Sequence, residues 1–500
     1  MSTLADFGDN VRYLEFYHRC ARPALASNFD DEFWSRIALQ MAHCEPAVRH
    51  ALIALGSLCE TEPGGIKHAR ARFATGGEYK IVLTHYNKSV RALIQRMAEP
   101  TYTPEVGLVT CLLFVCIEFL RGNYHTAFTH MRNGLSIISE RQQKQRFDSL
   151  SPVGSPSPPS TNGSSDRSYR ALESSTVQMP QRFVERDFGV PPHPVTLRDI
   201  PRNTSGAATM IDDKLTPIFI RGVTAAIMYG VDAEENLDIP LPYPSLLTHV
   251  AFTSLHQAQQ ACHELRNSSA LHVRNAARRL FRKEPVSVED LQRQSNLIAC
   301  HHAWYERLEL FLQNHRLSGD EHIALHALKT SHYTTLIYVS CSIWVDEMEF
   351  DAHIDAFRKI IHHAEAWIEE KTKVRLQGAP HFTFEMAIIS PLFFVATRCR
   401  CPATRRAAVA LLARHPPREG LWDSQQHVLA SNRVIEMEEE EVDPVTGWPV
   451  PNVRIFSCTI NADMDVNGGF WVSFIPARLL GTTGPNGGQK LVQQFFRLDH

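Results

Sequence analysis

A proline in the middle of an apolar stretch limits where one helix can end and the next can begin. The stretch NFDDEFWSRIALQMAHCEPAVRHALIALGSLCE runs from Asn28 to Glu60 and contains Pro46. Proline lacks a backbone N–H, so it suits the first turn of a helix, where that group has no partner. After Pro46, apolar residues recur at helical spacing: Ala47, Val48, Ala51, Leu52, Leu55 and Leu58. The stretch is therefore predicted to form two amphipathic helices packed as a hairpin.

Helical periodicity extends over most of the chain. Residues 12–145 are predicted to form five or six helices joined by short turns. The period returns at Leu215 and continues through five or more helices, with two more predicted over 382–398 and 404–415. The predicted fold class is all-α, with two packed arrays of antiparallel helices at residues 1–145 and 213–440.

The segment between these arrays, residues 146–212, has a different composition. SPVGSPSPPSTNGSSDRS (151–168) is rich in proline and serine and has almost no apolar residues. Burial cannot then offset the entropy lost on ordering, so the segment is predicted to be a disordered insert. Its Ser-Pro pairs could serve proline-directed kinases, although an unmodified linker is the favoured interpretation: Ser151-Pro152, Ser155-Pro156 and Ser157-Pro158.

Residues 441–500 are predicted to form a β-hairpin and a tail. VRIFSCTI and GFWVSFIP are rich in β-branched and aromatic residues, and Asn467-Gly468 between them is typical of a hairpin turn. The hairpin is expected to pack against the helices.

Charge and apolar pattern exclude several classes of protein. The net charge is -3, which provides no overall basic field for a phosphate backbone. The most apolar window, 106–120, is shorter than the roughly 20 residues that cross a bilayer, so no membrane contact is expected. The N-terminus has no basic region followed by an apolar core, so no secretory signal is expected.

No motif indicates a catalytic or metal site. His322 and His326 lie four residues apart and could bind one metal ion, but the intervening glutamate of a zinc hydrolase is missing, and a structural role is favoured. The eleven cysteines include no C-x-x-C pair and are expected to be reduced. There is no G-x-S-x-G element, so no enzyme, cofactor or metal is predicted.

Two charged runs have open interpretations. The basic run from Arg278 to Lys283 could be a nuclear import signal or a phosphate contact, but a solvated helix end is favoured. The acidic run from Glu436 to Glu441 could contact coactivators, but the charged end of a helix is favoured.

Several blocks resemble one protein family. FDDEFW, LQMAHCEPAVRHALIALGSLCE, YNKSVRALIQRM, VTCLLFVCIEFLRGNYHTAFTHMRNGLSII and RRAAVALLARHPPREGLWDSQQHVLASNRVIEMEE follow one another in this order. Together they resemble the regulatory region of fungal binuclear zinc cluster transcription factors, over residues 12–145 and 213–440. In that family, six cysteines within one short stretch hold two zinc ions and bind DNA. This sequence has no such stretch, so no direct nucleic-acid contact is expected.

The resemblance implies a function and a set of partners. The chain is expected to be a nuclear, fungal-specific transcriptional regulator that acts through protein partners, a homodimer or a small-molecule effector. The alternative is a helical scaffold or small-molecule-binding protein with no role in transcription. Seven residues are candidates for a structural role or for an effector pocket: Trp34, Glu45, Arg49, His50, Arg418, Glu419 and Trp422. For the segment from Pro417 to Asp423, the structural role is favoured.

Overall fold

The computed structural model describes most of the chain outside the predicted insert. The described residues are 10–25, 30–61, 64–67, 69, 79–150, 210–230, 251–343, 347–374, 381–482, 484 and 489–498. Residues 1–140 and 210–500 form one compact unit, and residues 141–209 form a second.

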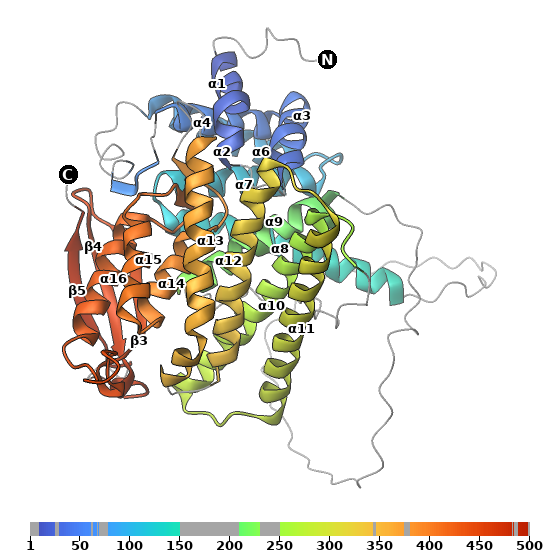
Figure 1. The fold of residues 1–500 in the computed structure, drawn as a ribbon. Helices are drawn as coiled ribbons and strands as arrows, with labels where there is room; N and C mark the ends of the chain where they lie inside the picture. Colours follow the sequence, from blue (N-terminus) through green and yellow to red (C-terminus); the bar gives the residue numbers. More distant parts are fainter. Residues whose placement is uncertain are drawn as a thin grey trace, which may run out of the picture. The chain divides into compact units, whose positions relative to one another are not determined.

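The first helices confirm the predicted hairpin at Pro46. Glu45 has an extended backbone and ends α3, and α4 begins at Pro46. The apolar helix α7 is buried along nearly its whole length. In chain order the elements are α1 (Val11–Phe16), η2 (Tyr17–Ala21), α2 (Arg22–Leu25), η3 (Phe33–Ile37), α3 (Ala38–Cys44), α4 (Pro46–Thr61), α6 (Lys80–Met97), α7 (Pro104–Leu120) and α8 (Tyr124–Leu150) (Figure 1).

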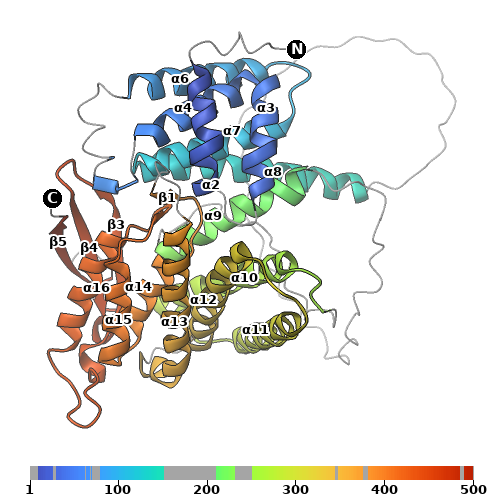
Figure 2. The same cartoon turned by 45° about the horizontal axis from the view of Figure 1, so that its top comes forward.

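Several helices after the predicted insert start at a serine whose side chain caps the helix. Ser254 caps α10, and Ser287 and Ser318 form capping boxes with Asp290 and Glu321 at the starts of α11 and α12. In chain order the elements are η4 (Ile211–Leu215), α9 (Thr216–Tyr229), α10 (Leu255–Arg282), α11 (Val288–Asn314), α12 (Gly319–Cys341), η5 (Glu347–His353), α13 (Ile354–Lys373), α14 (Ile389–Arg398), α15 (Pro402–Leu412) and α16 (Ser424–Glu438) (Figure 2).

The predicted hairpin is confirmed and has a third strand. β3 (Ile455–Met464), β4 (Gly469–Pro476) and β5 (Val492–Arg497) form an antiparallel sheet in the order β3-β4-β5. Gly468 at the turn has a φ of 81°, which glycine adopts without strain. The short 3₁₀ helices η6 (Pro451–Val453) and η7 (Ala477–Leu479) flank these strands. Residues 441–500 are thus more than the expected hairpin and tail, because β5 continues the sheet.

A second, very short sheet lies where the start of one helix was predicted. β1 (Phe382–Thr383) pairs in parallel with β2 (Arg418–Glu419), and α14 begins only at Ile389. The helix predicted over 382–398 was therefore too long at its start. The correction matters because β1 and β2 hold the turn that carries three of the candidate pocket residues.

The predominantly helical fold is confirmed, with small differences at the insert. Helix α8 continues to Leu150, and the chain is helical again at Met210, while the exact bounds 146–212 of the insert stay a prediction. The three Ser-Pro pairs lie outside the described residues. The division of the helices into two subdomains stays a prediction.

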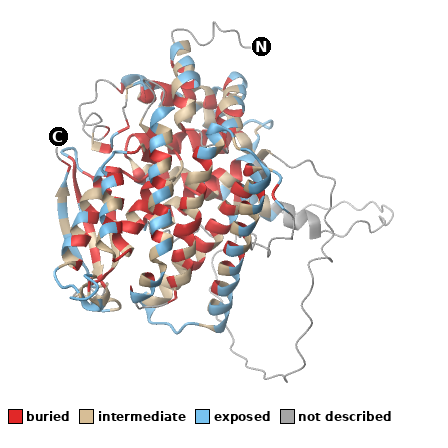
Figure 3. Ribbon diagram, in the orientation of Figure 1, coloured by how far each residue is buried: buried red, intermediate tan, exposed pale blue. Residues whose placement is uncertain are grey.

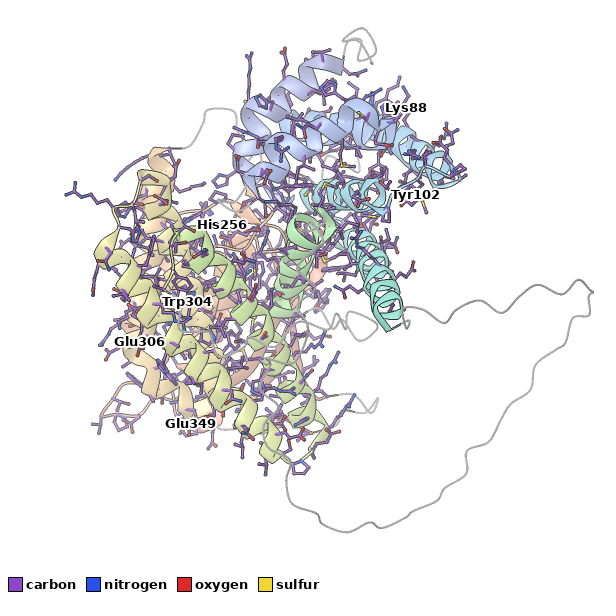
Figure 4. The ribbon with its side chains drawn as sticks, turned by 90° about the vertical axis from the view of Figure 1, so that its right-hand side faces the viewer. Lys88, Tyr102, His256, Trp304, Glu306 and Glu349 are labelled. Atoms are coloured by element: carbon purple, nitrogen blue, oxygen red, sulfur yellow. The ribbon has the colours of Figure 1, made fainter. Side chains whose placement is uncertain are left out.

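Two clusters of buried residues form the core of this unit. The larger includes α4, α7, α9, α14 and the inner face of the sheet. The smaller lies between α10, α11 and α12 around Trp304, whose Nε1 donates to the carbonyl of Ala258 at 2.8 Å. Trp304 is buried, while Glu306 on the same helix is exposed. Figure 4 labels both residues, and Figure 3 colours the buried residues of the helices red. The buried positions follow the helical period from which the fold class was predicted.

Candidate functional site

Trp34 belongs to the core of the N-terminal helices. It lies in η3, is fully buried, and packs edge-on against Phe33 with ring centroids 4.8 Å apart. The hydroxyl of Tyr17 donates to the carbonyl of Trp34 at 2.8 Å. Through these contacts Trp34 packs within the core of the N-terminal helices.

Glu45 and Arg49 stabilise the junction between α3 and α4. Arg96 donates from Nε to Glu45 Oε2 at 3.0 Å, which ties α6 to this junction. Arg49 donates to the carbonyl of Ala42 at 2.8 Å and to that of His43 at 2.6 Å. The last carbonyls of a helix lack partners within it, so a cation at this place both pairs and complements the helix dipole.

His50 faces a histidine of the neighbouring helix. The Nδ1 atoms of His50 and His85 lie 3.1 Å apart, so one ring donates to the other. Burial, together with the nearby His85, lowers the pKa of His50 to about 4. His50 is therefore uncharged at neutral pH, and this pair joins α4 to α6.

Arg418 and Glu419 lie on β2, in the segment PREGLWDS. Arg418 donates from Nη2 to the carbonyl of Leu120 at 3.0 Å and covers the ring of Phe382. The side chain of Glu419 accepts from the backbone N–H groups of Ala387 and Ile388 at 2.8 Å, and of Ile389 at 3.2 Å. Glu419 thus caps the start of α14, because its carboxyl oxygens accept from backbone N–H groups that have no partner within the helix.

Replacing Glu419 is expected to destabilise the chain. Glu419→Ala leaves three backbone N–H groups without their acceptor, and we expect a loss of about 2–3 kcal/mol in the free energy of unfolding. Glu419→Gln keeps one acceptor oxygen and is expected to lose less. Urea denaturation of both variants measures the difference, and equal stability of Glu419→Ala and the unaltered chain would contradict this capping role.

Trp422 differs from the other six candidates because it lines a cavity. The cavity encloses about 100 Å³. Its walls come from α9, α12, α14, α16, the turn before α16 and β3, all within the first compact unit. The structure does not bring the other six candidates to this cavity; among its lining residues are Tyr229, Phe393, Arg398, Trp422, His427 and Cys458.

Two side chains that line the cavity carry donors without a hydrogen-bond partner. Tyr229 and Trp422 are both more than nine-tenths buried, and neither the Tyr229 hydroxyl nor Trp422 Nε1 has a partner among the described residues. A water-sized molecule cannot reach either donor atom, so these two residues line the cavity with other atoms.

His427 contributes an acceptor and a fixed tautomer. Its Nδ1 lies 2.6 Å from the carbonyl of Asp423, which can only accept, so Nδ1 carries the proton and Nε2 is the acceptor nitrogen. Burial lowers the pKa of His427 to about 4, so the ring is neutral at pH 7. The ring packs against Phe393 and Trp422, with centroids 4.7 and 4.9 Å away.

The charge of Arg398 in the cavity wall is already compensated. Arg398 donates from Nη1 to Glu347 Oε2 at 2.6 Å and from Nη2 to the carbonyl of Phe456. Burial raises the pKa of Cys458, so its thiol stays protonated. The arrangement offers hydrogen bonds and aromatic surface, and it offers neither a free charge nor an activated nucleophile.

Sequence reasoning found Trp422 and missed its neighbours in the cavity. Tyr229 and Phe393 lie 193 and 29 residues before Trp422, and their helical patterns are those of ordinary core residues. His427 lies five residues after Trp422, in the same block of the family resemblance, so its proximity to Trp422 in the sequence is the signal that could have identified it.

The other chemical candidates are engaged elsewhere. His326 faces His363, with the two Nδ1 atoms 3.1 Å apart, and so has a partner on α13. Among the residues that the structure describes, no group of three or more histidine, cysteine or acidic side chains could hold a metal ion. In the same part of the chain, no helix combines the length and apolar character that a bilayer crossing needs.

Comparisons with known proteins agree with the resemblance seen in the sequence. Residues 12–179 match the family described as the fungal specific transcription factor domain. The chain is 28% identical over 117 residues to the transcription regulator lscL of Purpureocillium lilacinum, covering 23% of this chain and 28% of that protein. It is 27% identical over 146 residues to the aspercryptin biosynthesis cluster-specific transcription regulator atnN of Emericella nidulans, covering 27% of this chain and 21% of that protein. The matches thus span about a quarter of these relatives, and no solved structure matches the chain.

Proposed function

We propose that this chain, which carries a fungal specific transcription factor domain over residues 12–179, regulates transcription in the nucleus. The family match is the observation that carries the proposal. Two relatives with transcription regulator in their names, from different fungi, support it. The helical fold and the PREGLWDS turn are compatible with the regulatory region of that family.

In this proposal, the chain regulates transcription by contacting other proteins. The net charge of -3 offers no basic field for DNA, and the described residues contain no cluster of metal ligands. Promoter recognition is then supplied by residues other than those described, or by a DNA-binding partner. A second copy of the chain is one candidate partner.

A tethering experiment tests the proposal. We expect the 500-residue chain, fused to a heterologous DNA-binding domain, to change transcription of a matching reporter at least several-fold relative to that domain alone. The chain without the fused domain is the control and should leave the reporter unchanged. An unaltered reporter with the fusion, on both an active and a silent promoter, would count against transcriptional regulation.

A small-molecule-binding protein outside transcription is the second candidate function. The cavity beside Trp422, with several aromatic side chains in its wall, favours it. The two functions differ in where the protein acts, since a binding protein of this kind has no reason to concentrate in the nucleus. Fluorescence of the tagged chain in fungal cells separates them, together with the tethering result.

A further inference from the structure

The strand β5 forms an edge of the C-terminal sheet. The sheet has the order β3-β4-β5, so β5 pairs with β4 on one side only, and no further strand of the described chain continues the sheet beyond it (Figure 1). An edge strand presents N–H and C=O groups that can pair with another strand, and proteins often protect such edges with proline, lysine or a bulge. The sequence of β5, VQQFFR, contains no proline, lysine or acidic residue, and its pairing with β4 has no bulge.

The backbone of three residues in β5 points towards this free edge. Leu498 N donates to the carbonyl of Gly468 at 3.0 Å, so the residue that follows β5 directs its backbone towards the β4 side. In an antiparallel ladder this direction alternates from one residue to the next. The N–H and C=O groups of Gln493, Phe495 and Arg497 therefore point away from β4. A strand placed beside this edge can form backbone hydrogen bonds with all three residues.

The same three residues carry exposed side chains on one face of the sheet. Phe495 is 48% exposed, and Trp471, its partner in β4, is 47% exposed, with ring centroids 5.3 Å apart. Gln493 and Arg497 lie on the same face, on either side of Phe495, and both are exposed. Apolar side chains on an unprotected edge strand favour association with another strand.

The order of these residues favours a second copy of the same chain as that strand. When two β5 strands pair antiparallel about a two-fold axis at Phe495, Phe495 lies opposite Phe495 of the second copy, and Gln493 lies opposite Arg497. This is the one two-fold register that pairs the three outward-pointing residues of β5 with one another and with no residue outside β5. Each opposed pair exchanges two N–H···O bonds, so the register forms about six backbone hydrogen bonds.

We propose that two copies of this chain associate through β5, which joins their C-terminal sheets into one continuous sheet. The exposed face then carries a row of four aromatic rings, Trp471 and Phe495 from each copy, at cross-strand spacing. At both ends of the interface the Gln493 amide oxygen accepts from the Arg497 guanidinium of the second copy. The two Arg497 side chains are four residues apart along the strands, about 13 Å, so salt screens their repulsion.

The inference rests on the proposed function only for its consequence. A dimer brings two regulatory chains to one promoter, whereas the pairing itself does not depend on transcription. The pairing of single edge strands lies at the low end of specific interfaces, below about 1,200 Å². We therefore expect a dissociation constant in the micromolar range. Sedimentation velocity of the purified 500-residue chain, at about 1 to 100 µM, measures it.

Charge changes at Gln493 test the register. Gln493→Glu places a carboxylate opposite Arg497 of the second copy at both ends of the interface, and we expect about tenfold tighter association. Gln493→Arg places like charges opposite each other and should weaken association about tenfold. Adding Arg497→Glu to Gln493→Arg should restore it. Within one chain the two positions are about 13 Å apart along β5, so the fold of the monomer should not respond.

Phe495→Lys tests the centre of the interface. It places two ammonium groups beside the two-fold axis and removes the central pair of the aromatic row, so we expect a monomer at every concentration measured. Leu310→Lys is the matched control, because Leu310 is 49% exposed and lies on α11. It should dimerise like the unaltered chain.

Three results would overturn the proposal. They are a monomeric unaltered chain up to about 100 µM; the same affinity in Gln493→Glu and Gln493→Arg; or a dimer that Phe495→Lys leaves intact. A monomeric chain whose reporter activity in the tethering experiment is lost in Phe495→Lys would assign the edge to an extended segment of another protein and would also reject a second copy. If Phe495→Lys does not fold, the Gln493 variants decide. A negative tethering result would leave these sedimentation outcomes intact.

Discussion

Glu438→Gln is expected to lower the free energy of unfolding by about 3–5 kcal/mol, because it removes one anion from a fully buried group of charges. Glu438 Oε2 accepts from Arg405 Nη2 at 2.7 Å, and Glu438 Oε1 lies 3.3 Å from Arg400 Nη2. All three side chains are 0% exposed. Glutamine has nearly the same shape, so the loss reports the charge and not a change in volume.

The second carboxylate of the group cannot compensate for this loss. Glu347 Oε2 already accepts from Arg398 at 2.6 Å and from Arg400 at 3.0 Å. Without Glu438, three buried guanidinium groups would share one anion. The backbone N–H of Ile455, which donates to Glu438 Oε1 at 2.8 Å, would also be affected, and with it the start of β3.

Glu440→Gln is the matched control, since Glu440 is exposed and only two residues away. Its free energy of unfolding should lie within about 0.5 kcal/mol of the unaltered chain. Urea denaturation at pH 7 measures both variants. If Glu438→Gln were as stable as Glu440→Gln, the buried group of charges around Glu438 would have no stabilising role.

The acidic run from Glu436 to Glu441 illustrates what the sequence could and could not predict. Both interpretations offered for it, a coactivator contact and a charged helix end, assume exposed carboxylates. The side chains of Glu436, Glu440 and Glu441 are exposed as assumed. Glu438 is buried because it faces α15 and β3. Its cations lie 33 and 38 residues earlier, and no local pattern connects them.

Local signals explain the parts of the fold that were predicted correctly. Pro46 fixed the start of α4, and Asn467-Gly468 fixed the turn between β3 and β4, because each depends on the backbone of one or two residues. β5 was missed because its register is set by pairing with β4, as in the pairs Trp471 with Phe495 and Phe470 with Phe496. Such pairing is tertiary information.

The candidate site depends even more on tertiary contacts that the sequence does not reveal. The sequence singled out PREGLWDS as a block, and within it Glu419 caps a helix while Trp422 lines the cavity. Their opposite roles depend on the direction in which each side chain leaves the turn. The residues that line the cavity together with Trp422 come from α9, α14, α16 and β3, so they could be recognised only in the folded chain.

Acidification from pH 7 to pH 5 is the second change with a large expected effect. Burial lowers the pKa of His301 to about 3, and it lowers the pKa of His332 well below its usual value. The pair lies inside the smaller core cluster: the Nδ1 atoms are 3.4 Å apart, and Ser269 Oγ is 3.1 Å from His301 Nε2. In the unfolded chain, a histidine has a pKa of about 6.5.

The direction in which stability changes with pH follows from these pKa values. Below pH 6.5 the unfolded chain binds more protons at these histidines than the folded chain, so stability is fully present above pH 6.5 and falls towards pH 3. At pH 5, His301 alone accounts for a loss of about 2 kcal/mol. Asp30 and Glu419 oppose this, because burial raises the pKa of each to about 7, and their contribution decreases as the pH rises from about 4 through 7.

A variant isolates the histidine from the opposing carboxyl groups. We expect His301→Asn to be less stable than the unaltered chain at pH 7, and this difference to shrink by about 2 kcal/mol at pH 5, since asparagine does not titrate. His302→Asn is the matched control, because His302 is the exposed neighbour on the same helix, and its free energy of unfolding at pH 7 should lie within about 0.5 kcal/mol of the unaltered chain. Urea denaturation at half-unit steps of pH measures all three proteins. A difference between His301→Asn and the unaltered chain that stays constant from pH 7 to pH 5 would mean that His301 takes up its proton in the folded state as readily as in the unfolded chain, which its burial between α10 and α12 argues against.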